Sequence, residues 1–136
     1  MILVCGEALV DLLVDPRGME LAARPVPGGS AFNCAVGLAR VAAGNGVLVG
    51  YLGGLSADVF GRWLRARLHA EGVVPVSATE SIHPTRIVAV SRDAAGEPAY
   101  GFHGDAVADR DLPADGLLLD DDSPVRALVV GSFPIA

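Results

Sequence analysis

The sequence predicts an α/β fold with a parallel β-sheet at its core and helices packed beside it. Two runs of consecutive apolar residues, Ile2–Cys5 and 46–52, are typical of strands buried on both faces. After each apolar run comes a segment with helical patterning, at 30–43 and between positions 56 and 72. Between the first apolar run and the first of these segments lies a stretch of mixed polarity. Strand and helix therefore alternate along the chain, as in a sheet built with helical crossovers. A third apolar run, Ala127–Val130, predicts a third buried strand.

The first helix is expected to begin at Ser30, a good N-cap residue, and to run to about Ala43, where Gly44 ends it. Its sequence is apolar on every side except at Asn33 and Arg40. A helix with that composition is expected to be buried all round, and a lone Asn in its first turn then needs a hydrogen-bond partner.

The second helix is expected to follow Ser56 as its N-cap, with Asp58 in the first turn and Gly72 just beyond the last. Apolar residues recur every four positions along it, which predicts one face on the core. The predicted core face consists of Phe60, Leu64 and Leu68, with Trp63 beside them. The predicted solvent face carries Arg62, Arg65 and Arg67.

Shorter segments of mixed polarity predict two β-hairpins outside the core. Residues 9–14 and 21–24 flank a turn-rich stretch at 15–18, and residues 86–91 and 98–102 flank a turn at 93–97. Two connecting segments are expected, a loop at 25–29 and an acidic connector at 105–122. Because the chain stops six residues after its third apolar strand, that strand would lack cover, and we expect the fold to continue beyond residue 136.

The composition excludes several classes of function. With 136 residues, 51% hydrophobic and 19% charged, the chain is too apolar to be disordered. Its net charge of −6 argues against a broad surface for nucleic acid or anionic membranes. The basic residues other than histidine are all arginine, so chemistry that requires a lysine is impossible. Cys5 and Cys34 match no metal or redox spacing and are expected to be buried thiols. No signal peptide or membrane span is recognisable, which predicts a cytoplasmic protein.

Two short segments could hold a ligand rich in hydroxyl groups. Gly28 and Gly29 stand directly before the first helix, where absent side chains and free N–H groups let a ligand approach the backbone. Asp11 could accept hydrogen bonds from two sugar hydroxyls, and Asn33 could supply an amide. The same residues also allow a plain structural interpretation, with Asp11 on the solvent side of an edge strand, Asn33 as a local cap and the glycines as a turn.

Three sequence blocks occur in a specific order. They are Gly-Glu-Ala-Leu-Val-Asp at 6–11, Pro-Gly-Gly-Ser-Ala-Phe-Asn at 27–33 and Gly-Tyr-Leu-Gly-Gly-Leu-Ser-Ala-Asp-Val-Phe-Gly at 50–61. This order resembles the N-terminal half of PfkB (ribokinase-like) carbohydrate kinases of the fructokinase type. The likeness covers essentially the whole chain.

The resemblance implies a ribokinase-like α/β fold in which residues 1–136 are the N-terminal part of one kinase domain and the C-terminal half is absent. Strands near 9–24 and 86–102 would form a small β lid, through which the protein could form a homodimer. The implied activity is phosphoryl transfer from Mg-ATP to a hydroxyl of a small-molecule sugar, a hexose such as fructose, without nucleic-acid or membrane partners.

The resemblance also assigns residues. Asp11, Gly28, Gly29 and Asn33 fall on the family's sugar-binding positions, and Phe102 or His103 would close over the sugar.

No segment matches the family's Gly-Ala-Gly-Asp motif, which carries the catalytic base and the anion hole. We therefore assign no catalytic residue and no metal ligand to this chain, and expect ATP and Mg²⁺ to bind only in a complete enzyme. Two alternatives stay open, a sugar-binding or dimerisation module without catalysis and one half of a split kinase. His69, His83 and the acidic run at 120–122 are expected to be solvated surface groups.

Overall fold

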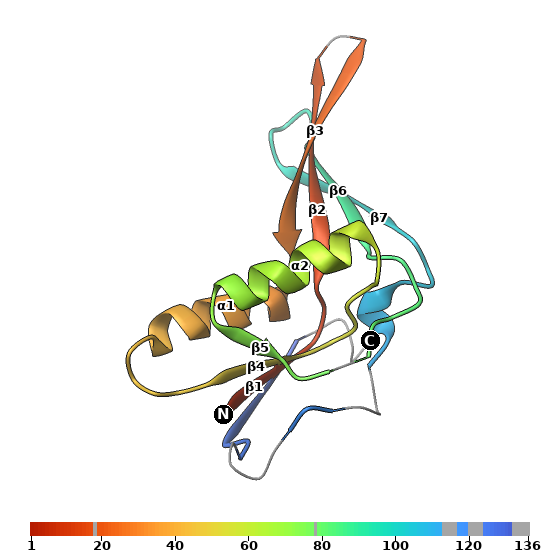
Figure 1. Cartoon of the computed structure of the whole chain (residues 1–136). Coiled ribbons are helices and arrows are strands. Elements are labelled where there is room, and N and C mark those ends of the chain that lie inside the picture. Colours follow the sequence, from red (N-terminus) through yellow and green to blue (C-terminus); the bar gives the residue numbers. More distant parts are fainter. Residues whose placement is uncertain (18, 78, 113–116, 120–123, 132–136) are drawn as a thin grey trace.

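The chain forms two four-stranded sheets, and the computed structural model describes residues 1–17, 19–77, 79–112, 117–119 and 124–131 (Figure 1). One sheet, the core sheet, is parallel throughout. In spatial order its strands are β5 (Val73–Pro75), β4 (Val49–Leu52), β1 (Ile2–Cys5) and β8 (Ala127–Val130). The predicted α/β fold with a parallel core is confirmed.

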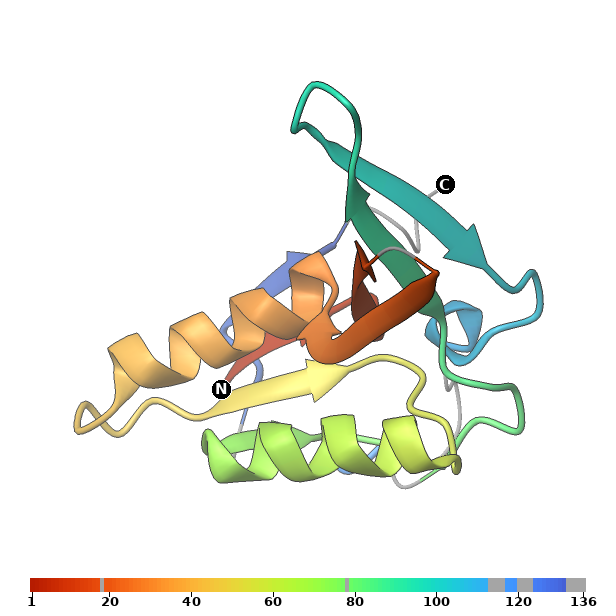
Figure 2. The same cartoon turned by 90° about the horizontal axis from the view of Figure 1, so that it is seen from above.

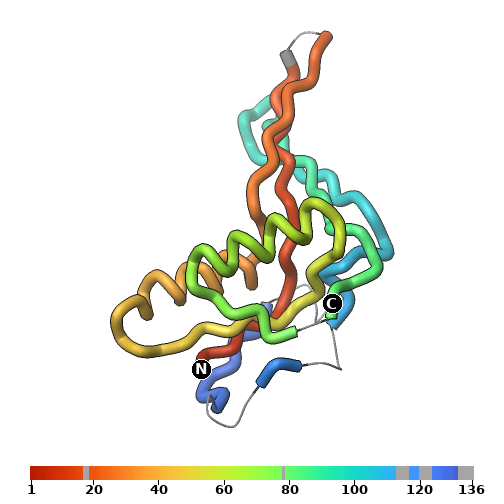
Figure 3. The backbone as a smooth tube through the Cα atoms, viewed as in Figure 1, coloured from red at the N-terminus to blue at the C-terminus, as the bar shows by residue number. Residues whose placement is uncertain are grey.

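The second sheet, called the lid sheet below, consists of two antiparallel hairpins joined side by side. Its order is β3 (Glu20–Gly28), β2 (Leu9–Arg17), β6 (Ile87–Arg92) and β7 (Pro98–His103). β2 and β6 pair in parallel and so connect the hairpins. The tube in Figure 3 shows the β2–β3 hairpin projecting beyond the rest of the chain, and Figure 2 shows β6 and β7 extending away from the helices.

Both predicted hairpins are confirmed, but the first is longer than expected. The stretch predicted as a turn at 15–18 continues β2 as far as Arg17, and the predicted loop at 25–29 belongs to β3 as far as Gly28. Pro25 and Pro27 are tolerated there because β3 is an edge strand, where a missing N–H breaks no ladder on the open side. β5 was not predicted, since three residues that include a proline give no recognisable strand pattern.

The hydrophobic core lies between the core sheet and two helices, α1 (Ser30–Ala42) and α2 (Val59–Ala70), which both lie on one side of that sheet in Figure 1. The predicted apolar face of α2 is confirmed, with Leu64 and Leu68 fully buried and Phe60 and Trp63 packed against the cluster. The core sheet contributes Val4, Val49, Tyr51 and Val73 to this core, and β2 contributes Val10.

Two predictions about the α2 arginines and the cysteines need correction. Arg62 and Arg67 are exposed, but Arg65 is half-buried, with its Nε 3.8 Å from a carboxylate oxygen of Glu80. Cys5 is buried, which raises the pKa of its thiol, whereas Cys34 is only half-buried.

The expectation that α1 is buried all round is wrong. Only Ala31, Phe32 and Ala35 are buried, and the side chain of Val41 is 79% exposed. α1 packs against the core sheet and β3 by one face only. An apolar helix surface can therefore remain uncovered in a chain of this length.

The third predicted strand forms, and its side chains lack cover, as expected for an apolar strand followed by so few residues. β8 forms at the predicted residues and pairs with β1, but it is the edge of the core sheet. Its side chains at Leu128, Val129 and Val130 are exposed. An edge strand has a neighbour on one side only, so an apolar run predicts the strand but not its cover. β4 begins at Val49 and not at position 46.

Candidate functional site

Asp11, Gly28 and Gly29 lie near the point where the core sheet passes into the lid sheet. β1 lies inside the core sheet, with β4 on one side and β8 on the other, so the strand order changes direction at β1. In open α/β sheets, ligands bind outside the carboxyl ends of the strands at such a switch point. β1 ends there at Cys5, and the chain continues through Glu7 into β2, while β3 returns to the same place and leads into α1.

Asp11 and Gly28 are in direct contact across the β2–β3 hairpin. A Cβ atom at Gly28 would lie 2.4 Å from Oδ2 of Asp11, closer than atoms can approach. The missing side chain of Gly28 therefore leaves the space that the Asp11 carboxylate uses. Asp11 is half-buried, and this burial raises the pKa of its carboxyl group.

Gly29 forms the turn from β3 into α1 and is the N-cap residue of that helix. Its φ of +102° lies in the region that favours glycine, and a Cβ there would lie 2.5 Å from the carbonyl oxygen of Glu7. The backbone N–H of Asn33 donates to the Gly29 carbonyl over 3.0 Å. Gly29 is thus required to be glycine by its φ and by a backbone clash, whereas a side chain at Gly28 would displace the Asp11 carboxylate.

The expectation of a buried, hydrogen-bonded Asn33 is wrong. Asn33 is exposed in the first turn of α1, and its side chain forms no hydrogen bond with the part of the chain that the structure describes. Its amide remains available to solvent or to a ligand, because α1 is covered on one face only.

Strand register places Phe102 and Asp11 on the same face of the lid sheet. Phe102 pairs with Val88, Val88 pairs with Asp11, and Asp11 pairs with Val26, so these four residues form one row across the strands. Phe102 is 54% exposed on that face. His103 is the next residue of β7 and therefore points to the opposite face. Of the two residues that the resemblance suggested for closing over the sugar, only Phe102 thus lies on the same face as Asp11.

A buried polar network lies beneath this site, and sequence reasoning missed it. Glu7 is 2% exposed, and its Oε1 accepts hydrogen bonds from the Ser30 backbone N–H over 2.6 Å and from the Ser30 hydroxyl over 2.5 Å. The Tyr51 hydroxyl donates to the Gly6 carbonyl over 2.7 Å. Burial, followed by the charge of Glu7, raises the pKa of Tyr51 well above its ordinary value. The one available signal was an acid directly after a buried strand.

The predicted N-cap residues of both helices are wrong. Ser30 is the first residue of α1 and makes no side-chain cap of its own, because its hydroxyl is bonded to Glu7. α2 is capped by Asp58, which accepts from the Gly61 N–H over 2.7 Å, while Ser56 instead accepts a hydrogen bond from the Asp58 N–H.

Two further contacts attach the lid sheet to the rest of the chain. Asp58 also accepts hydrogen bonds from the N–H and the hydroxyl of Thr85, over 2.8 and 2.7 Å, next to the start of β6. Arg86 pairs with Asp109 over 2.7 Å, and both side chains are almost fully buried. Asp109 belongs to the short 3₁₀ helix η1 (Ala108–Arg110), which lies within the predicted acidic connector.

The two histidines predicted as solvated groups differ. His69 is exposed on α2, as expected. His83 is partly exposed, but its Nδ1 lies 2.8 Å from Oδ2 of Asp111, and the Ser81 hydroxyl bonds the same oxygen. Because the serine and the histidine share one carboxylate oxygen, the group holds a loop together and does not form a nucleophilic triad.

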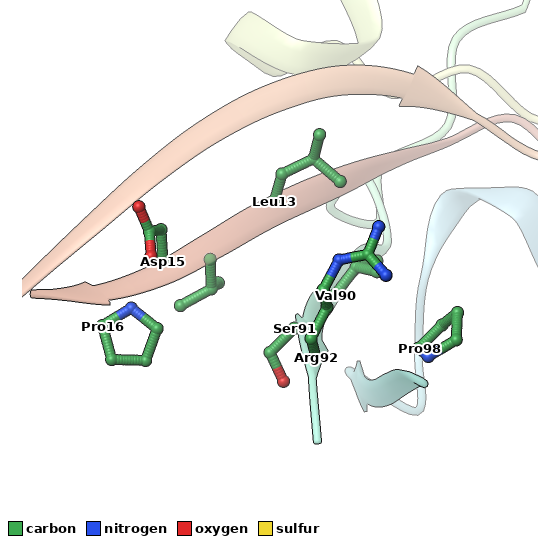
Figure 4. Close-up of a pocket in the computed structure, with 8 residues that line it drawn as sticks. Leu13, Asp15, Pro16, Val90, Ser91, Arg92 and Pro98 are labelled. Carbon is green, nitrogen blue, oxygen red and sulfur yellow. The ribbon is translucent and has the colours of Figure 1, made fainter. Parts of the chain in front are cut away.

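A hollow at the outer end of the lid sheet contains none of the predicted site residues. Figure 4 shows side chains from β2, β6 and β7 around it: Leu13, Asp15, Pro16, Val90, Ser91, Arg92 and Pro98, together with Val14. The candidate site described here rests on the contacts at Asp11 and the glycines and not on this hollow.

Within the described residues, no group of three or more His, Cys, Asp or Glu side chains is placed to hold a metal ion. The acidic run at 120–122 lies outside the described residues. None of the helices in the described part of the chain has the length and apolar character needed to span a membrane.

Comparison with known proteins identifies relatives of one kind. No protein-family model matches the chain. A fructokinase of Salmonella typhimurium is 37% identical over 100 residues, which are 73% of this chain and 30% of that protein. A crystal structure of a fructokinase from Xylella fastidiosa superimposes with a TM-score of 0.73 and 32% identity, over 85% of this chain and 37% of that one. A second structure of fructokinase from this organism, with bound ATP, gives a TM-score of 0.65 and 30% identity over 85% of this chain and 36% of that one.

The chain thus spans about a third of the length of the relatives that it matches. The resemblance to the N-terminal part of PfkB-type sugar kinases is confirmed, and so is the ribokinase-like fold.

Proposed function

From its likeness to the N-terminal third of PfkB-type sugar kinases, we propose that this chain forms the sugar-binding part of an ATP-dependent sugar kinase acting on a neutral hexose such as fructose. The observation that carries the proposal is the contact of the Asp11 carboxylate with Gly28, next to the turn into α1, with Phe102 on the same face of the lid sheet. A carboxylate and an exposed aromatic ring on one face suit a ligand with several hydroxyl groups and apolar C–H edges.

Each residue has a distinct part in binding. The Asp11 carboxylate accepts hydrogen bonds from sugar hydroxyls, each worth roughly 1.5–3 kcal/mol because the acceptor is charged. Gly28 leaves the space in which the Asp11 carboxylate lies, Gly29 forms the turn into α1, and the exposed Asn33 amide can donate and accept. Phe102 covers the apolar edge of the sugar and excludes water. None of these groups is a catalytic base.

The relatives supply the case for ATP, since one of the matching fructokinase structures has ATP bound. Phosphoryl transfer needs metal ions, anion-binding backbone and a positioned base around the phosphates. The described residues of this chain do not offer such a set, and we derive no step through ATP or Mg²⁺. The proposed contribution of this chain is to bind and orient the sugar.

The proposal is tested by titrating the protein with D-fructose in a calorimeter. Asp11→Asn removes the charge from the proposed ligand group and is expected to weaken fructose binding by about tenfold or more. Asp15→Asn is the matched control, because Asp15 lies on the same strand and the same face, nearer the hairpin tip. It is expected to change the affinity less than twofold. Equal effects of the two variants would remove Asp11 from the site.

The same purified protein distinguishes the two alternatives, a sugar-binding module without catalysis and one half of a split kinase. A sugar-binding module without catalysis binds fructose but never phosphorylates it with Mg-ATP, even when a full-length relative's C-terminal part is added as a separate polypeptide. Half of a split kinase gains activity in that mixture. A homodimer formed through the lid sheet remains a prediction, which sedimentation analysis tests directly.

A further inference from the structure

We propose that Glu7 is the positioning residue of the candidate sugar site. It caps α1 from outside the helix and thereby fixes the Gly28–Gly29 turn against the end of β1. The inference deepens the proposed function and rests on it for one of its two readouts. Glu7 itself would not touch the sugar.

The first step is the cap. The N-terminal N–H groups of a helix need acceptors, and these normally come from the N-cap side chain. The N-cap residue of α1 is Gly29, which has no side chain, and α1 has no acidic residue in its first turn. Glu7 supplies the missing acceptor, since its Oε1 takes both the N–H and the hydroxyl of Ser30. A carboxylate at this position also interacts favourably with the helix dipole.

The second step is the backbone. The carbonyl oxygen of Glu7 accepts a hydrogen bond from the N–H of Phe32 over 3.2 Å, and it lies 2.5 Å from the position that a Cβ at Gly29 would take. Glu7 therefore contacts the turn through its side chain and its main chain together. These contacts determine where Gly28 lies, and Gly28 in turn leaves the space for the Asp11 carboxylate.

The third step is the cost of this arrangement. The other carboxylate oxygen, Oε2, is buried and has no hydrogen-bond partner among the described residues. A buried charged oxygen left unpaired is unfavourable, and an apolar side chain would avoid it. The N–H of Ser30 needs an acceptor at this place, and a carboxylate offers in addition a favourable interaction with the helix dipole.

The experiment compares Glu7→Gln with Glu7→Ala in the full chain. Glutamine keeps one carbonyl oxygen for Ser30 and places its amide nitrogen where Oε2 has no partner. It is expected to lower the denaturation midpoint but to keep the dissociation constant for D-fructose within about threefold. Alanine removes the acceptor and is expected to weaken fructose binding by about tenfold or more. A purely structural role would make affinity follow stability in both variants.

Hydrogen exchange supplies a readout that does not depend on the sugar. Glu7→Ala is expected to speed exchange at the amides of Ser30 and Phe32 by about tenfold or more, whereas Glu97→Ala, which removes an exposed carboxylate in the lid sheet, leaves them unchanged. If Glu7→Ala does not fold, Ser30→Ala replaces it, since it removes one of the two bonds and should weaken fructose binding by about threefold.

The outcomes separate the two proposals. If the unchanged protein does not bind fructose, the proposed function fails, and the exchange rates alone decide whether Glu7 fixes the turn. If it binds and all Glu7 and Ser30 variants bind equally well, the positioning role is refuted.

Discussion

Replacing Asp58 by alanine should cost far more stability than a helix cap alone explains. The Asp58 carboxylate caps α2 through the Gly61 N–H and also accepts the N–H and the hydroxyl of Thr85, a buried residue at the base of the lid sheet. Loss of the cap costs about 1 kcal/mol. Leaving the buried Thr85 N–H without an acceptor costs about 1–3 kcal/mol more. We therefore expect Asp58→Ala to lower the free energy of unfolding by about 3 kcal/mol.

Chemical denaturation at pH 7 measures this loss, and Asp93→Ala is the matched control. Asp93 also accepts two backbone N–H groups, those of Ala95 and Glu97, but in an exposed hairpin turn. Water replaces the lost acceptor there, so we expect a loss of about 0.5 kcal/mol, as for most surface substitutions. If the two variants lose the same stability, burial at Thr85 is not the reason for the effect.

The pH dependence gives an independent test of the same contacts. Partial burial by itself raises the pKa of Asp58, but hydrogen bonds from the Thr85 and Gly61 N–H groups and from the Thr85 and Ser56 hydroxyls outweigh it and hold the pKa below its ordinary value. A carboxyl with a lowered folded-state pKa stabilises the fold above its unfolded value, about 4, and loses this contribution as the pH falls through the folded value. The gap between the unchanged protein and Asp58→Ala should therefore shrink below about pH 4. A gap that stays constant down to pH 2 would refute the reasoning.

Three further outcomes are expected. Gly29→Ala and Gly96→Ala both place a side chain at positive φ, but only at Gly29 would the Cβ meet a backbone carbonyl. Thermal denaturation should therefore show a loss of unfolding free energy about 1–2 kcal/mol larger for Gly29→Ala than for Gly96→Ala. Equal losses would contradict the close approach of the Glu7 carbonyl to Gly29. Asp109→Ala leaves the buried Arg86 without its carboxylate partner and should lower the free energy of unfolding, measured in urea, by about 3–5 kcal/mol. A loss below about 1 kcal/mol would mean that this ion pair is not buried in solution. Burial raises the pKa of Asp11 in the folded chain, so its ionised form destabilises the fold at pH values above the pKa of the unfolded chain. Asp11→Asn should therefore raise the thermal midpoint at pH 7, and this advantage should vanish near pH 3. A lower midpoint for the variant at pH 7 would contradict the prediction.

Elements whose signals depend only on neighbouring residues in the sequence could be predicted without the structure. Runs of apolar residues located β1 and β8, and turn residues between mixed segments located both hairpins. Asp11 and the two glycines each gave a local signal that also allowed a plain structural interpretation, and only the resemblance to sugar kinases grouped them as one site.

Burial was predicted less well, because a side chain is covered by elements that are distant in the sequence. The apolar composition of α1 indicated burial on all sides, but α1 packs mainly against the core sheet and β3. The same reasoning predicted a buried helix around Asn33, whereas Asn33 lies exposed in the first turn of α1. The lack of cover at β8 could be predicted only from the short stretch of chain that follows it.

By itself, the sequence determined the α/β class, the two hairpins and the residue types that suit a sugar. Only the tertiary structure decided which of these residues share a face and what holds them there. The register of four lid strands joins Phe102 to Asp11 and turns His103 away, and a carboxylate at Glu7 reaches 23 positions along the chain to cap α1. Both are consequences of strand pairing and packing between distant segments, which the sequence pattern of one segment cannot encode.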